Sequence, residues 1–160
     1  MTVPDPESST LAFIRRLLLA SLAAGIVGTA AELILLGHVD SAAQWIPLVA
    51  LAAAVPLLVW HAARPGPLTV RLIRLIMCAY IVFGIIGGGL HYDGNVEFER
   101  ELHPKDAGLM FLRHTLAGAT PVLAPGSMVL LGLLGIAHTY RHPFERRSGV
   151  PGDLSRSDLS

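Results

Sequence analysis

Four long apolar runs dominate this chain and restrict the structures that it can adopt. They cover about residues 17–37, 45–63, 72–90 and 116–140. A helix of about 20 apolar residues spans the hydrocarbon core of a bilayer, and the runs reach or approach that length. Because lipid offers the backbone no hydrogen-bond partners, spanning segments of this kind are helical. We therefore predict an all-α integral membrane protein, folded as a four-transmembrane-helix bundle.

The composition agrees with a membrane environment. Charged residues make up 15% of the chain, against roughly 25% in soluble domains. The net charge is +0, so there is no overall field to attract nucleic acid. We expect the lipid bilayer as the main partner, with other membrane subunits or further copies of the chain as additional ones. The single cysteine, Cys78, excludes an internal disulfide framework.

Short polar segments flank the predicted membrane domain. Residues 1–10 and 144–160 are rich in Pro, Ser, Asp and Arg and are expected to be disordered tails around a domain covering residues 11–143. Arg15 and Arg16 followed by an apolar run could also mark a secretory signal. The run from Leu17 to Gly37 is longer than the apolar region of a signal, which favours a membrane span.

The arginines predict the orientation. Most of them fall at the two termini and in the second connection, at Arg15, Arg16, Arg64, Arg71, Arg74, Arg141, Arg146 and Arg147. Because Lys and Arg concentrate on the cytoplasmic side, both termini should be cytoplasmic, in a plasma membrane of the bacterial inner type. The loop 91–115 should then lie outside.

Glu32 is the acidic residue that lies well inside a predicted span. It sits roughly 7–8 Å below the outer boundary, at 1.5 Å per residue. Ser21, Gly25, Gly28 and Glu32 share one helix face, and Tyr80, Gly84, Gly88 and His91 share another. Faces of small residues let helices approach closely. We expect the first and third spans to pack face to face and to bring Glu32 near His91.

These residues suggest a metal site on the outer side. Asp93-Gly94-Asn95 is a turn sequence that would fold Glu97 back toward His91. Imidazole and carboxylate groups suit transition-metal ions. The predicted ligands are Glu32, His38, His91 and Glu97, with His114 as a further member. A haem held by two of His38, His91 and His114 is the lesser alternative, because histidines at a membrane boundary more often meet headgroups or water.

Glu32 and the other acidic and histidine side chains of the chain also have structural interpretations. Glu32 could hydrogen-bond a neighbouring helix and fix its packing. Glu99, Glu101 and Asp106 could form a solvated acidic loop. His61, His138 and His142 lie among arginines, and headgroup contact would account for His61 and His138. The spacings match no specific metal motif.

The fourth span is interrupted. Pro121 and Pro125-Gly126 break its first half. Residues 107–119 are expected to form an interfacial helix on the outer surface.

Nothing in the chain resembles a phosphate-binding loop, a nucleophile elbow or a dinucleotide fingerprint, so the sequence identifies no reaction and leaves open whether the protein is an enzyme. We predict a small polytopic membrane protein with an outward-facing Glu/His site under an acidic loop, binding a metal ion or redox cofactor. The alternatives are a non-catalytic accessory subunit of a larger membrane complex and an oligomeric bundle that exchanges protons or ions through Glu32.

Overall fold

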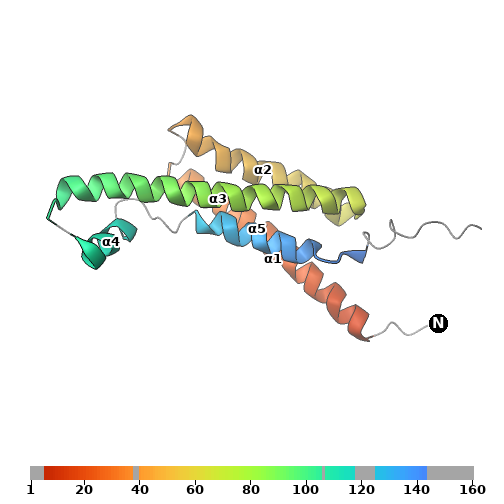
Figure 1. Cartoon of the computed structure of the whole chain (residues 1–160). Coiled ribbons are helices and arrows are strands. Elements are labelled where there is room, and N and C mark those ends of the chain that lie inside the picture. Colours follow the sequence, from red (N-terminus) through yellow and green to blue (C-terminus); the bar gives the residue numbers. More distant parts are fainter. Residues whose placement is uncertain (1–5, 38–39, 106, 118–124, 144–160) are drawn as a thin grey trace, which may run out of the picture.

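The computed structural model describes residues 6–37, 40–105, 107–117 and 125–143. The regular structure in these ranges is helical throughout, which confirms the all-α part of the predicted fold class. Figure 1 shows the five helices: α1 (Pro6–Leu35), α2 (Ala42–Ala63), α3 (Pro67–Leu102), α4 (Gly108–Leu116) and α5 (Gly126–Thr139). Helix α1 begins inside the segment that we expected to be a disordered tail up to Thr10.

Three of the helices are long and apolar enough to cross a membrane. These are α1 from Ser9 onward, α2 and α3. In their most apolar stretches only 11% to 33% of the residues are buried inside the bundle. Apolar surface on this scale is unfavourable in water, so the three helices indicate integration into a lipid bilayer.

Helix α5 is a shorter apolar helix of 14 residues. At 1.5 Å per residue it is about 21 Å long, against roughly 30 Å for the hydrocarbon core. The structure thus supplies three long spans and one short apolar helix where four full spans were predicted. The short helix α4 falls within residues 107–119, as expected, whereas Pro121 lies outside the described residues.

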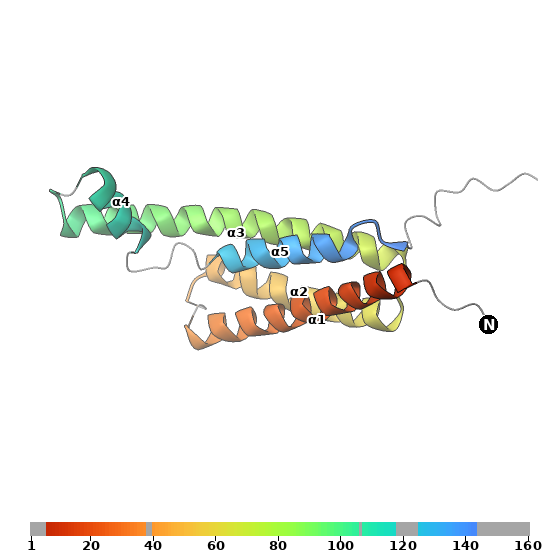
Figure 2. The same ribbon diagram turned by 90° about the horizontal axis from the view of Figure 1, so that it is seen from below.

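The core lies between α1, α2, α3 and α5. Its buried side chains include Leu22 and Ile26 of α1, Leu51 of α2, Met77 and Tyr80 of α3 and Leu131 of α5. The hydroxyl group of Tyr80 donates a hydrogen bond to the Ala50 carbonyl, 3.1 Å away, and ties α3 to α2. Figure 2 shows α3 and α5 lying side by side, with α1 and α2 below them.

Glycines allow α3 and α5 to approach closely. A Cβ atom added at Gly132 of α5 would lie 2.6 Å from the Met77 carbonyl oxygen of α3. A Cβ atom at Gly84 of α3 would lie 2.8 Å from the Pro125 carbonyl oxygen. Since these neighbours are backbone atoms, they cannot move aside without shifting a helix. The two helices run antiparallel along this seam.

The predicted pairing of the first and third spans is wrong. Helix α1 packs mainly against α2 and α5, and α5 lies along α3. Gly25 of α1 meets the Leu131 side chain of α5, and Gly84 of α3 meets Val129 of α5. Gly25 and Gly84 of the two small-residue faces are therefore packed, but against α5, whereas a Cβ atom at Gly28 would meet nothing within 4 Å. Sequence periodicity identifies a packing face without identifying the helix that covers it.

The predicted turn at Asp93-Gly94-Asn95 is also wrong. Helix α3 continues through it to Leu102, so the first part of the expected outer loop is a helical arm that carries α4 (Figure 1). Asn95 is 1% exposed, and its side-chain amide donates a 2.9 Å hydrogen bond to the Thr115 carbonyl of α4. Packing against α4 and the helix-forming residues from Glu97 to Leu102 override the local turn preference.

Replacing Gly132 by alanine should destabilise the bundle by about 1–3 kcal/mol, because the new methyl group overpacks the α3–α5 seam. Gly28→Ala is the matched control, since a Cβ atom there meets nothing within 4 Å. It should change the stability by no more than about 1 kcal/mol, in the stabilising direction, because alanine favours the helix. Denaturant titration in detergent measures both changes, and equal effects would contradict the close approach.

Candidate metal centre

Three buried histidines meet at the end of the bundle where α2 and α5 finish. His61 lies in the last turn of α2 and His138 in the last turn of α5, and His142 follows α5. Their side chains are 3%, 3% and 7% exposed. The ring centroids are 5.3 Å apart for His61 and His138 and 5.5 Å apart for His61 and His142. One nitrogen of each ring lies within 4.8 Å of a nitrogen of the other two.

The contacts of His61 are compatible with a hydrogen on its Nδ1 atom. Its Nδ1 atom lies 2.7 Å from the hydroxyl oxygen of Thr69. That hydroxyl group donates its hydrogen to the Gly66 carbonyl, 3.0 Å away. The Gly66 backbone N–H also donates to this hydroxyl oxygen, at 3.1 Å. With its one hydrogen on the Gly66 carbonyl, Thr69 accepts from Nδ1 of His61, which is the tautomer that a metal ion on Nε2 requires. In the neutral ring Nε2 then carries a lone pair.

His138 has the same proton arrangement. Its Nδ1 atom lies 3.1 Å from the carbonyl oxygen of Arg15. Since a carbonyl oxygen can only accept, Nδ1 of His138 carries the hydrogen and Nε2 is free to bind a ligand. A backbone carbonyl on the second nitrogen is the arrangement that orients metal-binding histidines in many proteins.

The two Nε2 atoms face each other at 3.3 Å. In neutral rings two lone pairs would meet at this distance, which is unfavourable unless a cation lies between them. Nitrogen ligands about 2.0–2.1 Å from a tetrahedral Zn²⁺ ion are about 3.3–3.4 Å apart. The observed separation therefore fits two ligands of one tetrahedral ion, with His142 beside them as a third.

Arginines hold the segment that carries His138 and His142. The Arg74 guanidinium donates to the Thr139 carbonyl at 2.9 Å, and the Arg15 guanidinium donates to the Arg141 carbonyl at 3.1 Å. Cations at the carboxyl end of a helix bind its last carbonyls and complement its dipole. Arg141 itself has a φ of 45°, a left-handed conformation that costs roughly 1–2 kcal/mol outside glycine. This turn precedes His142, whose ring packs against His61 and His138.

The described members of the predicted ligand set come from three helices, α1, α3 and α4, and do not form one group. Glu32 is exposed on α1, and Glu97 is exposed on α3. His91 is half-buried on α3, and His38 lies outside the described residues. Two groups of metal-binding side chains occur in the part of the chain that the structure describes, and they include His114 but not Glu32, His91 or Glu97.

His114 belongs to the second of these groups. It lies on α4 beside His103, with ring centroids 5.4 Å apart, and Glu99 of α3 completes the group. The sequence analysis assigned Glu99 to a solvated loop, but the residue is 7% exposed.

Sequence reasoning missed the three-histidine cluster, which it assigned to headgroup contact. One signal was present: His138 and His142 are four residues apart, the spacing at which two histidines bind one zinc ion on a helix. Comparisons with protein families, curated proteins and solved structures gave no match. The chemistry of the residues therefore carries the functional argument.

Proposed function

We propose that this chain is an integral membrane protein that binds a transition-metal ion through His61, His138 and His142. The observation that carries the proposal is the 3.3 Å separation of the two facing Nε2 atoms in a buried three-histidine cluster. The Arg15 carbonyl on Nδ1 of His138 and the Thr69 hydroxyl group on Nδ1 of His61 support it, because both can accept a ring hydrogen there. Neutral imidazoles suit Zn, Cu, Fe and Ni ions. Zn²⁺ is the reference ion because its tetrahedral geometry fits the ligand separation.

The competing explanation is a shared proton. One Nε2 atom could hold a second hydrogen and donate it to the other, as an imidazolium–imidazole pair. This arrangement needs His61 and His138 but not His142, whose ring lies 5.5 Å and 5.8 Å from theirs. The third histidine therefore favours a metal ion.

The site is proposed to face the cytoplasm. The cluster lies at the bundle end that holds Arg15, Arg64 and Arg74. Arg15 and Arg74 donate to carbonyls at or just after the end of α5, and Arg64 directly follows α2. Arginine-rich ends remain on the cytoplasmic side. A cytoplasmic ion would then reach the site at the carboxyl ends of α2 and α5, and the helical arm would project from the opposite membrane face.

Removing one ligand should remove the ion. The full chain, purified in detergent without chelators and reconstituted with Zn²⁺, should hold one ion per chain in this site after dialysis against a weak chelator. His138→Ala should lose it, whereas His91→Ala should retain it, because His91 lies outside the cluster. Elemental analysis by mass spectrometry measures the content. A helicity measurement confirms that each variant is folded, and a wild-type chain that holds no ion would refute the proposal.

Thr69→Val should weaken binding by about 10–100-fold, the usual effect of losing an outer partner of a metal-bound histidine. Valine has nearly the shape of threonine but cannot accept the His61 hydrogen. Thr139→Val is the matched control, because its buried hydroxyl oxygen lies 3.1 Å and 3.0 Å from the Gly135 and Ile136 carbonyl oxygens of its own helix and not beside a histidine nitrogen. Zn²⁺ titration against a competing chelator measures both affinities. Equal losses would show that Thr69 does not act through His61.

The orientation has a separate test. In a Cys78→Ala background, a cysteine at the exposed position Asp93 should react with an impermeant maleimide on intact cells. A cysteine at the exposed Arg64 should react after lysis alone, because it lies at the arginine-rich end. The reverse pattern would invert the proposed topology while leaving the metal site untouched.

A further inference from the structure

We infer that Glu99, His103 and His114 form a second site for a divalent transition-metal ion, at the opposite end of α3. The inference does not rest on the proposed function, since it concerns different residues, and either site could be occupied without the other. Like the site predicted from the sequence, it combines imidazole and carboxylate ligands and includes His114. Its other two ligands, Glu99 and His103, differ from those predicted.

The geometry brings the three side chains to one point. Glu99 and His103 are one turn apart on α3, with 2.9 Å between Oε2 of Glu99 and Nδ1 of His103. His114 comes from α4, with its ring centroid 5.4 Å from that of His103. One ligand atom of each residue lies within 4.8 Å of the other two.

The positions of these ligands are fixed by packing between α3 and α4. The Asn95 amide donates to the Thr115 carbonyl, next to His114. One turn further along α3, the Glu99 side chain is 9% exposed. A carboxylate that is removed from water needs a positive partner. His103 supplies one hydrogen bond to it, and a metal ion would supply a full compensating charge.

A simple ion pair on the surface of a helix explains less of this arrangement. Glu99 and His103 alone would form a common i, i+4 pair worth a few tenths of a kcal/mol. Such a pair gives no reason for a second imidazole from another helix to approach the same carboxylate. Two imidazoles and one carboxylate are a donor set that divalent first-row ions such as Zn²⁺, Fe²⁺ and Co²⁺ accept.

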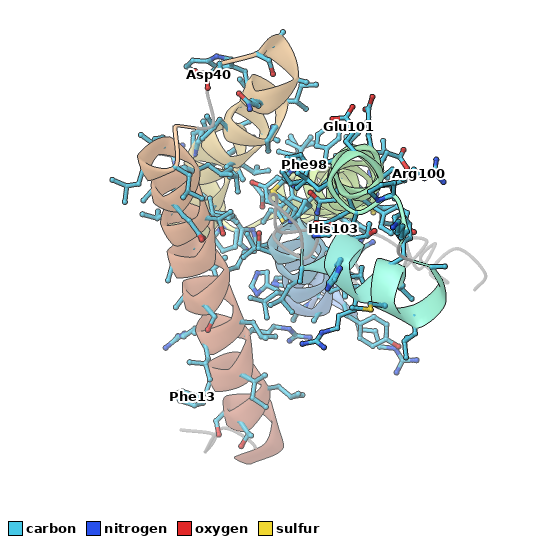
Figure 3. The ribbon with its side chains drawn as sticks, turned by 90° about the vertical axis from the view of Figure 1, so that its left-hand side faces the viewer. Phe13, Asp40, Phe98, Arg100, Glu101 and His103 are labelled. Carbon is cyan, nitrogen blue, oxygen red and sulfur yellow. The ribbon has the colours of Figure 1, made fainter. Side chains whose placement is uncertain are left out.

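This site is open to solvent, unlike the three-histidine cluster. The His103 side chain is 50% exposed. A cavity of about 400 Å³ lies beside it, lined by Arg100, His103, Pro104, Ala107 and Phe111. Three protein ligands leave further coordination positions for water, so an ion here should exchange readily. Figure 3 shows His103 on the side of α3 that faces α4, with Glu101 on the far side.

The two sites belong to opposite ends of the protein. Thr69, which contacts His61, and Glu99 are 30 residues apart on one helix, or about 45 Å at 1.5 Å per residue. This exceeds the roughly 30 Å of a bilayer core. With α3 spanning the membrane, the second site lies on the face opposite the three-histidine cluster, on the proposed outer side.

The experiment titrates Co²⁺ into the full chain carrying His61→Ala and His138→Ala, which remove the three-histidine cluster. Binding is followed by the visible absorption of Co²⁺ and by calorimetry. We expect one bound ion, removed at once by EDTA. Adding Glu99→Gln should lower the Co²⁺ affinity by about tenfold or more. Glu101→Gln makes the same charge change on the exposed side of the same helix and should leave the affinity unchanged. Absence of binding in the double variant, or equal losses from the two glutamine substitutions, would overturn the inference.

A wild-type titration covers the case in which the double variant fails to fold. Wild-type protein should bind one Co²⁺ ion that EDTA removes rapidly, and Glu99→Gln or His114→Ala should abolish this rapid fraction alone. Persistence of the rapid fraction in both variants would refute the second site. The slowly released fraction reports on the three-histidine cluster, so failure of that proposal is seen separately.

Discussion

The close packing of α5 on α3 is the contact on which both the bundle and the three-histidine cluster depend. Helix α5 has 14 residues and is too short to span a bilayer by itself. Gly132 lets its backbone rest against the Met77 carbonyl, and Arg74 holds its last turn through the Thr139 carbonyl. These contacts fix the height of α5 along α3. As a result His138 lies level with Thr69, and therefore with His61.

Backbone groups at the same end of the bundle then fix the chemistry of the histidines. The turn before α3 supplies the Gly66 carbonyl, which takes the Thr69 hydrogen and leaves Thr69 to accept from His61. The Arg15 carbonyl in α1 accepts from His138. Helices α1, α2, α3 and α5 all contribute to the orientation of two imidazoles. A metal ion bound there would couple the four helices, so ion binding and bundle stability should be linked.

Much of the fold follows from local properties of the sequence, whereas the sites depend on contacts between distant residues. The apolar runs predict α1, α2 and α3 because length and hydropathy alone decide whether a segment suits lipid. The small-residue faces of Gly25 and Gly84 are also visible, but which helix covers them is not, and α5 lies against both. The helical arm depends on the burial of Asn95 against Thr115 of another helix. His61 and His138 are 77 residues apart, so no local pattern joins them.

The two histidine sites differ most in charge, and this difference constrains what each could hold. The three-histidine cluster offers imidazoles alone, and the Arg15 guanidinium binds the carbonyl just before His142. A divalent ion there would keep its full charge near another cation in a poorly solvated place, where repulsion is strong. An anionic fourth ligand such as hydroxide would lower that charge, and metal-bound water loses a proton readily. At the proposed second site Glu99 would supply one negative charge, so an ion there would keep neutral water and exchange it.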